Sequence, residues 1–406
     1  MIPEGELPMK AQKGQVKVIT GNGAAAYAAM LCRPDVVTSY PITPMSEVAE
    51  QLSAFHADGI LDAEMVEVEG ENSAMNVVAA ASITGGRAFT ATSSWGLAFM
   101  YDAVQQASGF RAPVVMAIAN RETPGILAVS GGQQDIISTR DTGWIQIIVE
   151  DCQEIFDTII MAFRLAEDYN IQLPVMVNYD GFYLSYLAQA VEIAAREDVD
   201  RFLAPLKQQP QRPTLVPGEP LGCGTHGIEI GFVELRYKHC MAMERVTTKL
   251  DEIDKEFGEF FGRSYGGQIE EYRTGDAEIM VIASGGAAGT ARTVVDAKRN
   301  EGIKVGLIKL RLFRPFPRKR LIEALRGKKA IGVIDRSVCF GWNCGPTYME
   351  LRALSPEFGV VPMLSYIDGM ANLDITVPHI ERVIDETYAA ACGKPYQEVT
   401  WIPLEE

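Results

Sequence analysis

The sequence lacks the features that mark membrane, secreted or nucleic-acid-binding proteins. Its longest apolar stretches, such as residues 113–119, are far shorter than the roughly eighteen residues of a membrane-spanning helix. The N-terminus shows neither the basic nor the apolar segment of an export signal. Lysine and arginine number 37 against 53 acidic residues, and a net charge of −16 disfavours nucleic acid and anionic membrane surfaces. We therefore expect a cytoplasmic protein whose partners are small molecules and other subunits.

Cysteine is also sparse, and its spacing fits neither a disulfide framework nor a metal cluster. The seven cysteines run from Cys32 to Cys392 without any C-x-x-C pair, and only Cys339 and Cys344 lie close together. Zinc and iron–sulfur sites need about four ligands at short recurring spacings. We predict reduced thiols and no metal or cluster on this chain.

Short apolar runs alternate with segments of helical periodicity from Val16 to about Asp180. This is the pattern of parallel strands joined by crossover helices. The predicted strands cover residues 16–20, 35–40, 65–69, 88–92, 113–119, 144–149 and 173–178, and two of the helices cover residues 46–56 and 154–168. An α/β layered domain is the consequence.

The second half of the chain begins with a proline-rich stretch and an amphipathic helix. Five prolines interrupt residues 204–220, which predicts a linker or surface excursion. Apolar residues then recur every three or four positions from Met243 to Phe257, on a helix that could pack on its own chain or on a partner. A second α/β unit follows, with predicted strands at 278–283, 305–310, 331–335 and 360–364 and a closing helix from Thr376. We place the boundaries at 1–235, 236–275 for the connecting helix, and 276–406.

Unusual residues follow four of the predicted strands, where ligands of open parallel sheets bind. They are Tyr-Pro-Ile-Thr-Pro (40–44), Glu-Gly-Glu-Asn-Ser-Ala (69–74), Ser-Ser-Trp-Gly-Leu (93–97) and Asn-Arg-Glu-Thr-Pro-Gly (120–125). Each also has a purely structural explanation. Thr43 is a good helix N-cap before a proline, Glu71 suits a first helical turn, and Arg121 can be a surface cation. An arginine that ends a buried strand nevertheless often meets an anion.

Six ordered motifs resemble the alpha subunit of the 2-oxoacid:ferredoxin oxidoreductases, the pyruvate synthase family. They are Thr-Gly-Asn-Gly-Ala-Ala-Ala (20–26), Tyr-Pro-Ile-Thr-Pro (40–44), Glu-Asn-Ser-Ala-Met (71–75), Thr-Ala-Thr-Ser-Ser-Trp-Gly-Leu (90–97), Arg-Asp-Thr-Gly-Trp (140–144) and Arg-Leu-Phe-Arg-Pro-Phe-Pro (311–317). The resemblance spans nearly the whole chain. It implies a pyrimidine-type thiamine-diphosphate-binding parallel-sheet domain followed by a smaller transketolase C-terminal-like α/β domain. The implied activity is the coenzyme A-dependent oxidative decarboxylation of a 2-oxo acid.

The resemblance also implies roles for individual residues. Glu71 matches the catalytic glutamate that bonds the pyrimidine ring, where a carboxyl group against a ring nitrogen favours the imino tautomer that removes the thiazolium proton. Thr43 and Arg121 match positions that contact the 2-oxo oxygen and the carboxylate of the substrate. Trp95 falls in the substrate pocket, and the cofactor-binding positions include Ile42 and Ser94.

The chain lacks parts that such an enzyme needs, which implies partner subunits. Thiamine enzymes hold Mg²⁺ and the diphosphate with a Gly-Asp-Gly segment and a later asparagine, and Tyr179-Asp180-Gly181 is not that motif. Ligands for [4Fe-4S] clusters are also missing. The resemblance therefore implies a beta subunit with the diphosphate half-site and a cluster, a gamma subunit, and a ferredoxin-like delta subunit. Ferredoxin, or NAD through a further subunit, would accept the electrons.

Departures from the family pattern put pyruvate as substrate in doubt. They lie at Trp95, at residues 122–125, at Gln133 and at residues 369–374. Our hypothesis is that Trp95 reshapes the pocket for a larger or aryl 2-oxo acid such as phenylglyoxylate, although packing explains this side chain equally well.

Two other classes of protein are weighed against this interpretation. A dinucleotide-binding dehydrogenase is suggested by residues 284–289, Ser-Gly-Gly-Ala-Ala-Gly, but serine replaces the first glycine and the next strand ends without an acidic residue. A non-catalytic assembly subunit is the second alternative. The presence of Thr43, Glu71 and Arg121 together argues against it.

Overall fold

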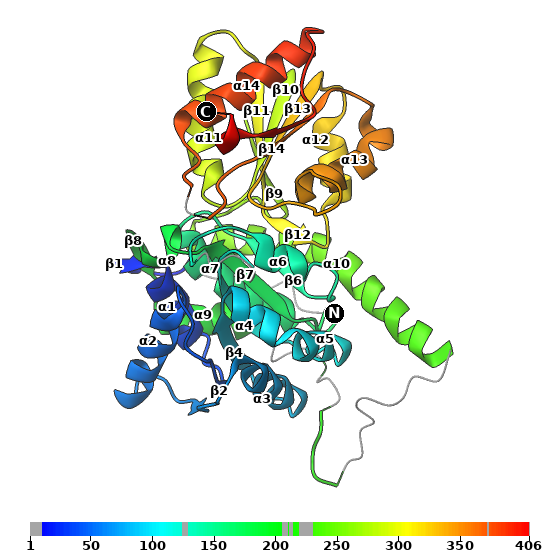
Figure 1. Cartoon of the computed structure of the whole chain (residues 1–406). Helices are drawn as coiled ribbons and strands as arrows, with labels where there is room; N and C mark the ends of the chain where they lie inside the picture. The colour runs from blue at the N-terminus through cyan, green and yellow to red at the C-terminus, as the bar shows by residue number, and fades with distance from the viewer. Residues whose placement is uncertain are drawn as a thin grey trace.

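The computed structural model describes residues 10–123, 129–204, 210, 214–218, 230–371 and 373–405. Most of the proline-rich stretch lies outside these residues. Two parallel-sheet units make up the described chain, one above the other in the view of Figure 1. The α/β fold class is confirmed.

The first unit is built on a seven-stranded sheet in the order β12-β6-β7-β5-β4-β2-β3. Six of its strands are parallel: β2 (Val36–Val37), β3 (Glu64–Met65), β4 (Ala88–Thr92), β5 (Val115–Asn120), β6 (Ile145–Ile148) and β7 (Val175–Asp180). β4 has the predicted bounds, whereas β2 and β3 are shortened to two residues each. These strands place the polar segments that follow β2, β3, β4 and β5 along one edge of the sheet.

One predicted strand belongs elsewhere, which corrects the sequence analysis. β1 (Gln15–Thr20) pairs antiparallel with β8 (Ala188–Ile193) in a separate two-stranded sheet. The apolar alternation of residues 16–20 identified a strand correctly, but its partner lies far along the chain. A second unforeseen pairing is β12 (Leu312–Arg314), a segment of the second half that runs antiparallel to β6.

Helices cover both faces of the seven-stranded sheet because successive strand residues point to opposite sides. α1 (Gly21–Leu31), α2 (Ser46–Ala57), α7 (Cys152–Ala166), α9 (Arg196–Leu203) and α10 (Ile230–Phe261) share one core with Phe89, Ala91 and Ala117. α3 (Glu71–Ile83), α4 (Ser94–Phe99), α5 (Tyr101–Gly109) and α6 (Gln134–Ser138) share the other core with Ala88, Met116 and Ile118. The short α8 (Tyr183–Tyr186) follows β7.

The second unit has a six-stranded sheet in the order β15-β14-β13-β10-β11-β9. Its strands are β9 (Ile269–Tyr272), β10 (Ile279–Ala283), β11 (Val305–Leu310), β13 (Ala330–Asp335), β14 (Met363–Ile367) and β15 (Val399–Trp401), and only β9 is antiparallel. α11 (Ala287–Asn300) and α14 (Val377–Ala391) pack on one face, while α12 (Arg318–Leu325) and α13 (Pro346–Phe358) pack on the other. A single 3-10 turn, η2 (Ile402–Leu404), follows β15. β14 starts three residues later than predicted, and β9 and β15 were not predicted.

The long helix α10 packs on its own chain over its C-terminal part. Val246, Leu250, Ile253 and Phe257 are buried in the core of the first unit. Its N-terminal part carries exposed apolar side chains, including Phe232 and Tyr237, and this end projects beyond the body in Figure 1. No helix within the described ranges is both long and apolar enough to cross a membrane.

A buried ion network joins the second unit to the first. Lys309 Nζ lies 2.6 Å from Glu154 Oε2, and Arg311 Nε lies 2.5 Å from Glu154 Oε1. Burial opposes ionisation of Glu154, but the two cations outweigh burial and lower the pKa of this carboxyl. The residues that end β11, where a dinucleotide-binding protein would place an acidic residue, therefore serve to hold α7.

Candidate active site

Glu71 is a buried carboxylate at the first position of α3. Glu71 is 9% exposed, and no described residue forms a hydrogen bond with its side chain. Gly96 of α4 lies against it, so a Cβ at position 96 would come within 2.8 Å of Glu71 Oε1 and 2.3 Å of Thr92 Oγ1. Thr92 Oγ1 is itself buried without a hydrogen-bond partner. A buried carboxylate costs free energy unless a polar partner meets it, so this arrangement fits a ring nitrogen of a bound aminopyrimidine.

Arg121 and Thr43 are brought together from the ends of different strands. Arg121 Nη1 donates to the Thr43 carbonyl oxygen at 2.8 Å, and Arg121 is 5% exposed. Burial lowers the pKa of its guanidinium, and the nearby Asp135 partly offsets this effect. The Thr43-Pro44 peptide bond is cis. The sequence placed these two residues on one edge, and the structure adds a direct contact.

The segment at 40–44 is also fixed by the first helix. Asn22 Nδ2 donates to the Pro44 carbonyl at 2.7 Å, and Tyr179 donates its hydroxyl to Asn22 Oδ1 at 2.8 Å. All three groups belong to the interior of the first unit, where Asn22 and Tyr179 are fully buried. The Thr-Gly-Asn-Gly motif thus holds the 40–44 segment, which carries Thr43, through the Asn22 side chain.

The other predicted site residues differ in their surroundings. Ser94 is buried with a φ of +35°; its hydroxyl donates to the Glu122 carbonyl and its backbone N–H to Asp135 Oδ2 at 3.3 Å. Ile42 is half-buried against the core of the first unit. Trp95 is 45% exposed, and Phe99, one helical turn later on α4, is 63% exposed. Two aromatic side chains therefore remain accessible on the helix that covers Glu71.

The sequence analysis assigned no role to Asp135, which the structure places behind Ser94 and Arg121. Asp135 is 1% exposed, and its two carboxylate oxygens accept hydrogen bonds from four N–H groups. Burial raises the pKa of this carboxyl to about 7, against the lowering effect of those hydrogen bonds. The only sequence signal was an acidic residue before the apolar pair Ile136-Ile137, which is equally typical of an ordinary helix start.

Three of the departures from the family pattern meet at the boundary between the two units. Burial, and then the charge of Asp135, raises the pKa of Glu122 to about 7, while Arg336 and the Ala371 backbone act in the opposite direction. Gln133 donates its backbone N–H to the Arg336 carbonyl at 3.1 Å. Arg336 Nε donates to the Gly369 carbonyl at 3.1 Å. Glu122, Gln133 and the backbone of residues 369–371 therefore form one cluster around Arg336, at the boundary of the second unit.

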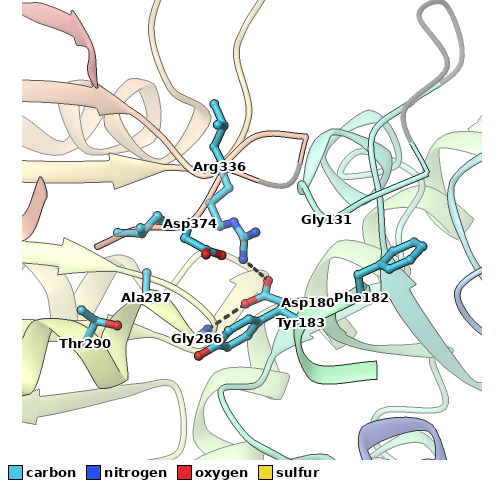
Figure 2. Close-up of a pocket in the computed structure, with 12 residues that line it drawn as sticks. Gly131, Asp180, Phe182, Tyr183, Gly286, Ala287, Thr290, Arg336 and Asp374 are labelled. Carbon is cyan, nitrogen blue, oxygen red and sulfur yellow. Dashed lines mark hydrogen bonds and ion pairs between the residues drawn. The ribbon is translucent and has the colours of Figure 1, made fainter. Parts of the chain in front are cut away.

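A cavity of about 430 Å³ lies beside this cluster, between the two units. Figure 2 shows Asp180 reaching across it, with one oxygen 2.9 Å from the Gly286 backbone N and the other 2.7 Å from Arg336 Nη1. Glu71, Thr43 and Arg121 are not among its lining residues. Because a carboxylate already meets the Gly286 backbone N–H at the start of α11, the loop at 284–289 is unsuited to a dinucleotide phosphate.

Two family models and full-length relatives match this chain. Residues 27–255 match the model of the pyruvate flavodoxin/ferredoxin oxidoreductase thiamine-diphosphate-binding domain, and residues 277–380 match pyruvate:ferredoxin oxidoreductase core domain II. The chain is 42% identical to the alpha subunit of NADH-dependent phenylglyoxylate dehydrogenase from Aromatoleum evansii, covering 94% of this chain and 93% of that protein. It is also 42% identical to pyruvate synthase subunit PorA from Methanothermobacter thermautotrophicus, covering 96% and 99% respectively.

Two solved structures share the fold of this chain. The 2-oxoglutarate:ferredoxin oxidoreductase from Magnetococcus marinus, solved with 2-oxoglutarate, coenzyme A and succinyl-CoA bound, superposes with a TM-score of 0.71 at 21% identity and covers 92% of this chain. The present chain spans 65% of the length of that chain. A split-gene transketolase superposes with a TM-score of 0.54 at 11% identity, covering 92% of this chain and 100% of its own. The family models and the full-length relatives together establish that the chain belongs to the pyruvate flavodoxin/ferredoxin oxidoreductase family.

Proposed function

We propose that this chain is the alpha subunit of a thiamine-diphosphate-dependent 2-oxo acid oxidoreductase and that Glu71 binds the aminopyrimidine of the cofactor. The observation that carries the proposal is the buried Glu71 carboxylate. It has no hydrogen-bond partner among the described residues, and the absence of a side chain at Gly96 leaves space for it. The overall reaction converts a 2-oxo acid and coenzyme A into an acyl-CoA, carbon dioxide, a proton and two electrons.

Three residues of the chain divide the work around the cofactor. When bound, thiamine diphosphate would supply a nucleophilic carbon for the 2-oxo group and a thiazolium ring that accepts the electron pair left by decarboxylation. Glu71 holds a proton against the pyrimidine ring nitrogen, which sets the tautomer of the ring. Arg121 binds the substrate carboxylate, because a guanidinium matches a planar carboxylate, and the Thr43 hydroxyl meets the 2-oxo oxygen. A single strong anchor on the carboxylate still permits carbon dioxide to leave.

Partner subunits complete the enzyme in this proposal. A beta subunit contributes Mg²⁺, the diphosphate half-site and a [4Fe-4S] cluster, and gamma and ferredoxin-like delta subunits carry electrons to ferredoxin or to NAD. Support comes from the sequence, which lacks the Gly-Asp-Gly segment and cluster ligands. Within the described residues, moreover, no three His, Cys, Asp or Glu side chains are grouped to hold a metal.

The decisive experiment replaces Glu71 in the enzyme assembled with its co-purifying subunits. Glu71→Gln keeps the shape of the side chain but removes the carboxyl proton, so turnover should fall by about 10²- to 10⁴-fold, the range for a lost general acid–base contribution. Glu69→Gln, at an exposed position two residues earlier, is the matched control and should retain wild-type turnover. Unchanged turnover of Glu71→Gln in an intact complex would instead support the non-catalytic assembly subunit.

Besides pyruvate, a larger or aryl 2-oxo acid is a candidate substrate. It is favoured by the exposed Trp95 and Phe99 on the helix that covers Glu71. Steady-state kinetics with pyruvate, 2-oxoglutarate and phenylglyoxylate will rank the candidates. If Trp95 lines the acyl pocket, Trp95→Ala should change the ratio of kcat/KM values for phenylglyoxylate and pyruvate by about tenfold or more, since burial of an aromatic side chain is worth that much. Trp342→Ala, at a 74% exposed tryptophan of the second unit, should leave the ratio unchanged. An unchanged ratio in Trp95→Ala would exclude Trp95 from the substrate pocket.

A further inference from the structure

Asp135, the second residue of α6, is a hub for backbone groups at the candidate site. Its Oδ2 accepts from the backbone N–H of Arg121 at 3.0 Å and of Ser94 at 3.3 Å. Its Oδ1 accepts from the backbone N–H of Ile136 at 2.8 Å and from Asn120 Nδ2 at 3.2 Å. Both oxygens of a 1% exposed carboxylate are therefore fully committed to N–H donors.

Three of these four donors come from two neighbouring strand ends, and the fourth, the Ile136 N–H, belongs to α6 itself. Ser94 begins α4 directly after β4, whereas Asn120 and Arg121 end and follow β5, the strand that pairs with β4. Backbone N–H groups at the end of a sheet have no ladder partner, and leaving them buried and unpaired would cost free energy. The Asp135 carboxylate accepts hydrogen bonds from both strand ends and thereby fixes the distance between them.

Two further contacts hold the same short segment from other sides. The Ser94 hydroxyl donates to the Glu122 carbonyl, and Arg121 Nη1 donates to the Thr43 carbonyl at 2.8 Å. Residues 120–122 are thus tied to α6, to α4 and to the 40–44 segment. The backbone of Arg121 has little freedom to move while Asp135 is in place.

We propose that Asp135 is a positioning residue that holds Arg121 where it meets the substrate carboxylate, with Ser94 as a brace, without touching the ligand itself. The inference rests on the proposed function of Arg121. Asp135 should accordingly control how tightly the 2-oxo acid is bound, more than the rate of the steps after binding.

Asp135→Asn in the assembled enzyme tests the inference. An amide must turn its NH₂ group toward one of the two carboxylate positions, and each position faces two N–H donors, so either orientation breaks two hydrogen bonds. We expect the KM for the 2-oxo acid to rise roughly ten- to hundredfold, the loss expected for hydrogen bonds to a buried charge. The change in kcat should be smaller, and the Kd for thiamine diphosphate should stay within about twofold of the wild-type value.

A matched control separates positioning from a general loss of stability. Asp254 of α10 is 3% exposed and accepts from Ser264 Oγ at 2.6 Å, Tyr265 N at 2.9 Å and Gly266 N at 3.1 Å. Asp254→Asn breaks a comparable set of hydrogen bonds away from the site. It should lower the thermal midpoint while leaving KM unchanged.

A double-mutant cycle with Arg121→Gln gives the decisive readout. If Asp135 acts through Arg121, Asp135→Asn should raise KM by less than about twofold in the Arg121→Gln background. A wild-type KM in Asp135→Asn, or fully additive effects in the cycle, would overturn the inference. A wild-type KM in Arg121→Gln would instead refute the role of Arg121 and with it the proposed site.

A milder variant covers the case in which Asp135→Asn fails to assemble. Asn120→Ala removes a single donor to Asp135 Oδ1 and keeps both backbone contacts. We expect it to raise KM several-fold in the same direction, at unchanged Kd for thiamine diphosphate. An unchanged KM in Asn120→Ala would then count against the inference.

Discussion

At the scale of single residues, Gly96 sets how closely α4 can approach the Glu71 carboxylate. A methyl group at position 96 would overlap Thr92 Oγ1 and lie 2.8 Å from Glu71 Oε1. Thr92 is fully buried in β4 and cannot yield, so the added methyl group would push the Glu71 carboxylate aside. Shape as well as charge therefore defines this part of the site.

Gly96→Ala should lower turnover of the assembled enzyme by about tenfold or more, because overpacking of roughly 1–3 kcal/mol displaces the carboxylate. Steady-state kinetics and thiamine-diphosphate titration will measure the effect. Gly109→Ala is the control, since a Cβ at position 109 meets nothing within 4 Å. Equal activity of the two variants would show that turnover does not depend on the present position of the Glu71 carboxylate.

At the scale of elements, one glutamate of α7 bonds two cations at the end of β11 and so joins the second unit to the first. Glu154 is fully buried and bonds both Lys309 and Arg311, which are 2% and 0% exposed. Lys309 has a further carboxylate at 2.8 Å in Glu150, whereas the second acidic neighbour of Arg311, Asp254, lies 3.7 Å away. The attachment of β11 and β12 to α7 therefore depends on this one side chain.

Glu154→Gln should lower the free energy of unfolding by about 3–5 kcal/mol, the cost of leaving buried cations without their partner. Urea denaturation of the purified chain will measure it. Glu357→Gln breaks an ion pair with Arg318 in which the side chains are 48% and 65% exposed, and should cost less than about 1 kcal/mol. Similar losses in both variants would contradict a structural role for the buried network.

At the scale of the whole molecule, the two units meet at a carboxyl group, Glu122, whose pKa is raised toward neutrality. Glu122 of the first unit lies against Arg336 and the Ala371 backbone of the second, and its pKa is raised to about 7. A carboxyl whose pKa is higher in the folded protein than in the unfolded chain binds extra protons on folding. Its contribution to stability is therefore present at low pH and is lost as the pH rises through 7.

Glu122→Gln, which cannot titrate, should make stability less sensitive to pH. Between about pH 5 and pH 8 the wild-type chain should lose on the order of 1–3 kcal/mol more than the variant, from the difference between the ordinary and the raised pKa. Urea midpoints measured across this range will show it. Parallel pH profiles for the two proteins would mean that Glu122 does not titrate in this window.

The sequence by itself predicted most of the helices and strands and named the residues of the candidate site. Strands at 88–92 and 305–310 have their predicted bounds because continuous apolar runs of that length are buried on both faces of a sheet. The same pattern placed Thr43, Glu71 and Arg121 after parallel strands, whose ends must share one edge. These properties depend on nearby residues only, so local order in the chain was enough.

Only the tertiary structure decided the contacts between distant segments. β1 pairs with β8, β12 joins the sheet of the other unit, and Lys309 meets Glu154 across 155 positions of sequence. Asp135 belongs to the same class, because its value to the site comes from two N–H groups that follow separate strands, β4 and β5. The local sequence around a side chain does not specify which distant backbone groups it will contact. Those contacts form only when the layers pack, because every buried polar group then needs a hydrogen-bond partner.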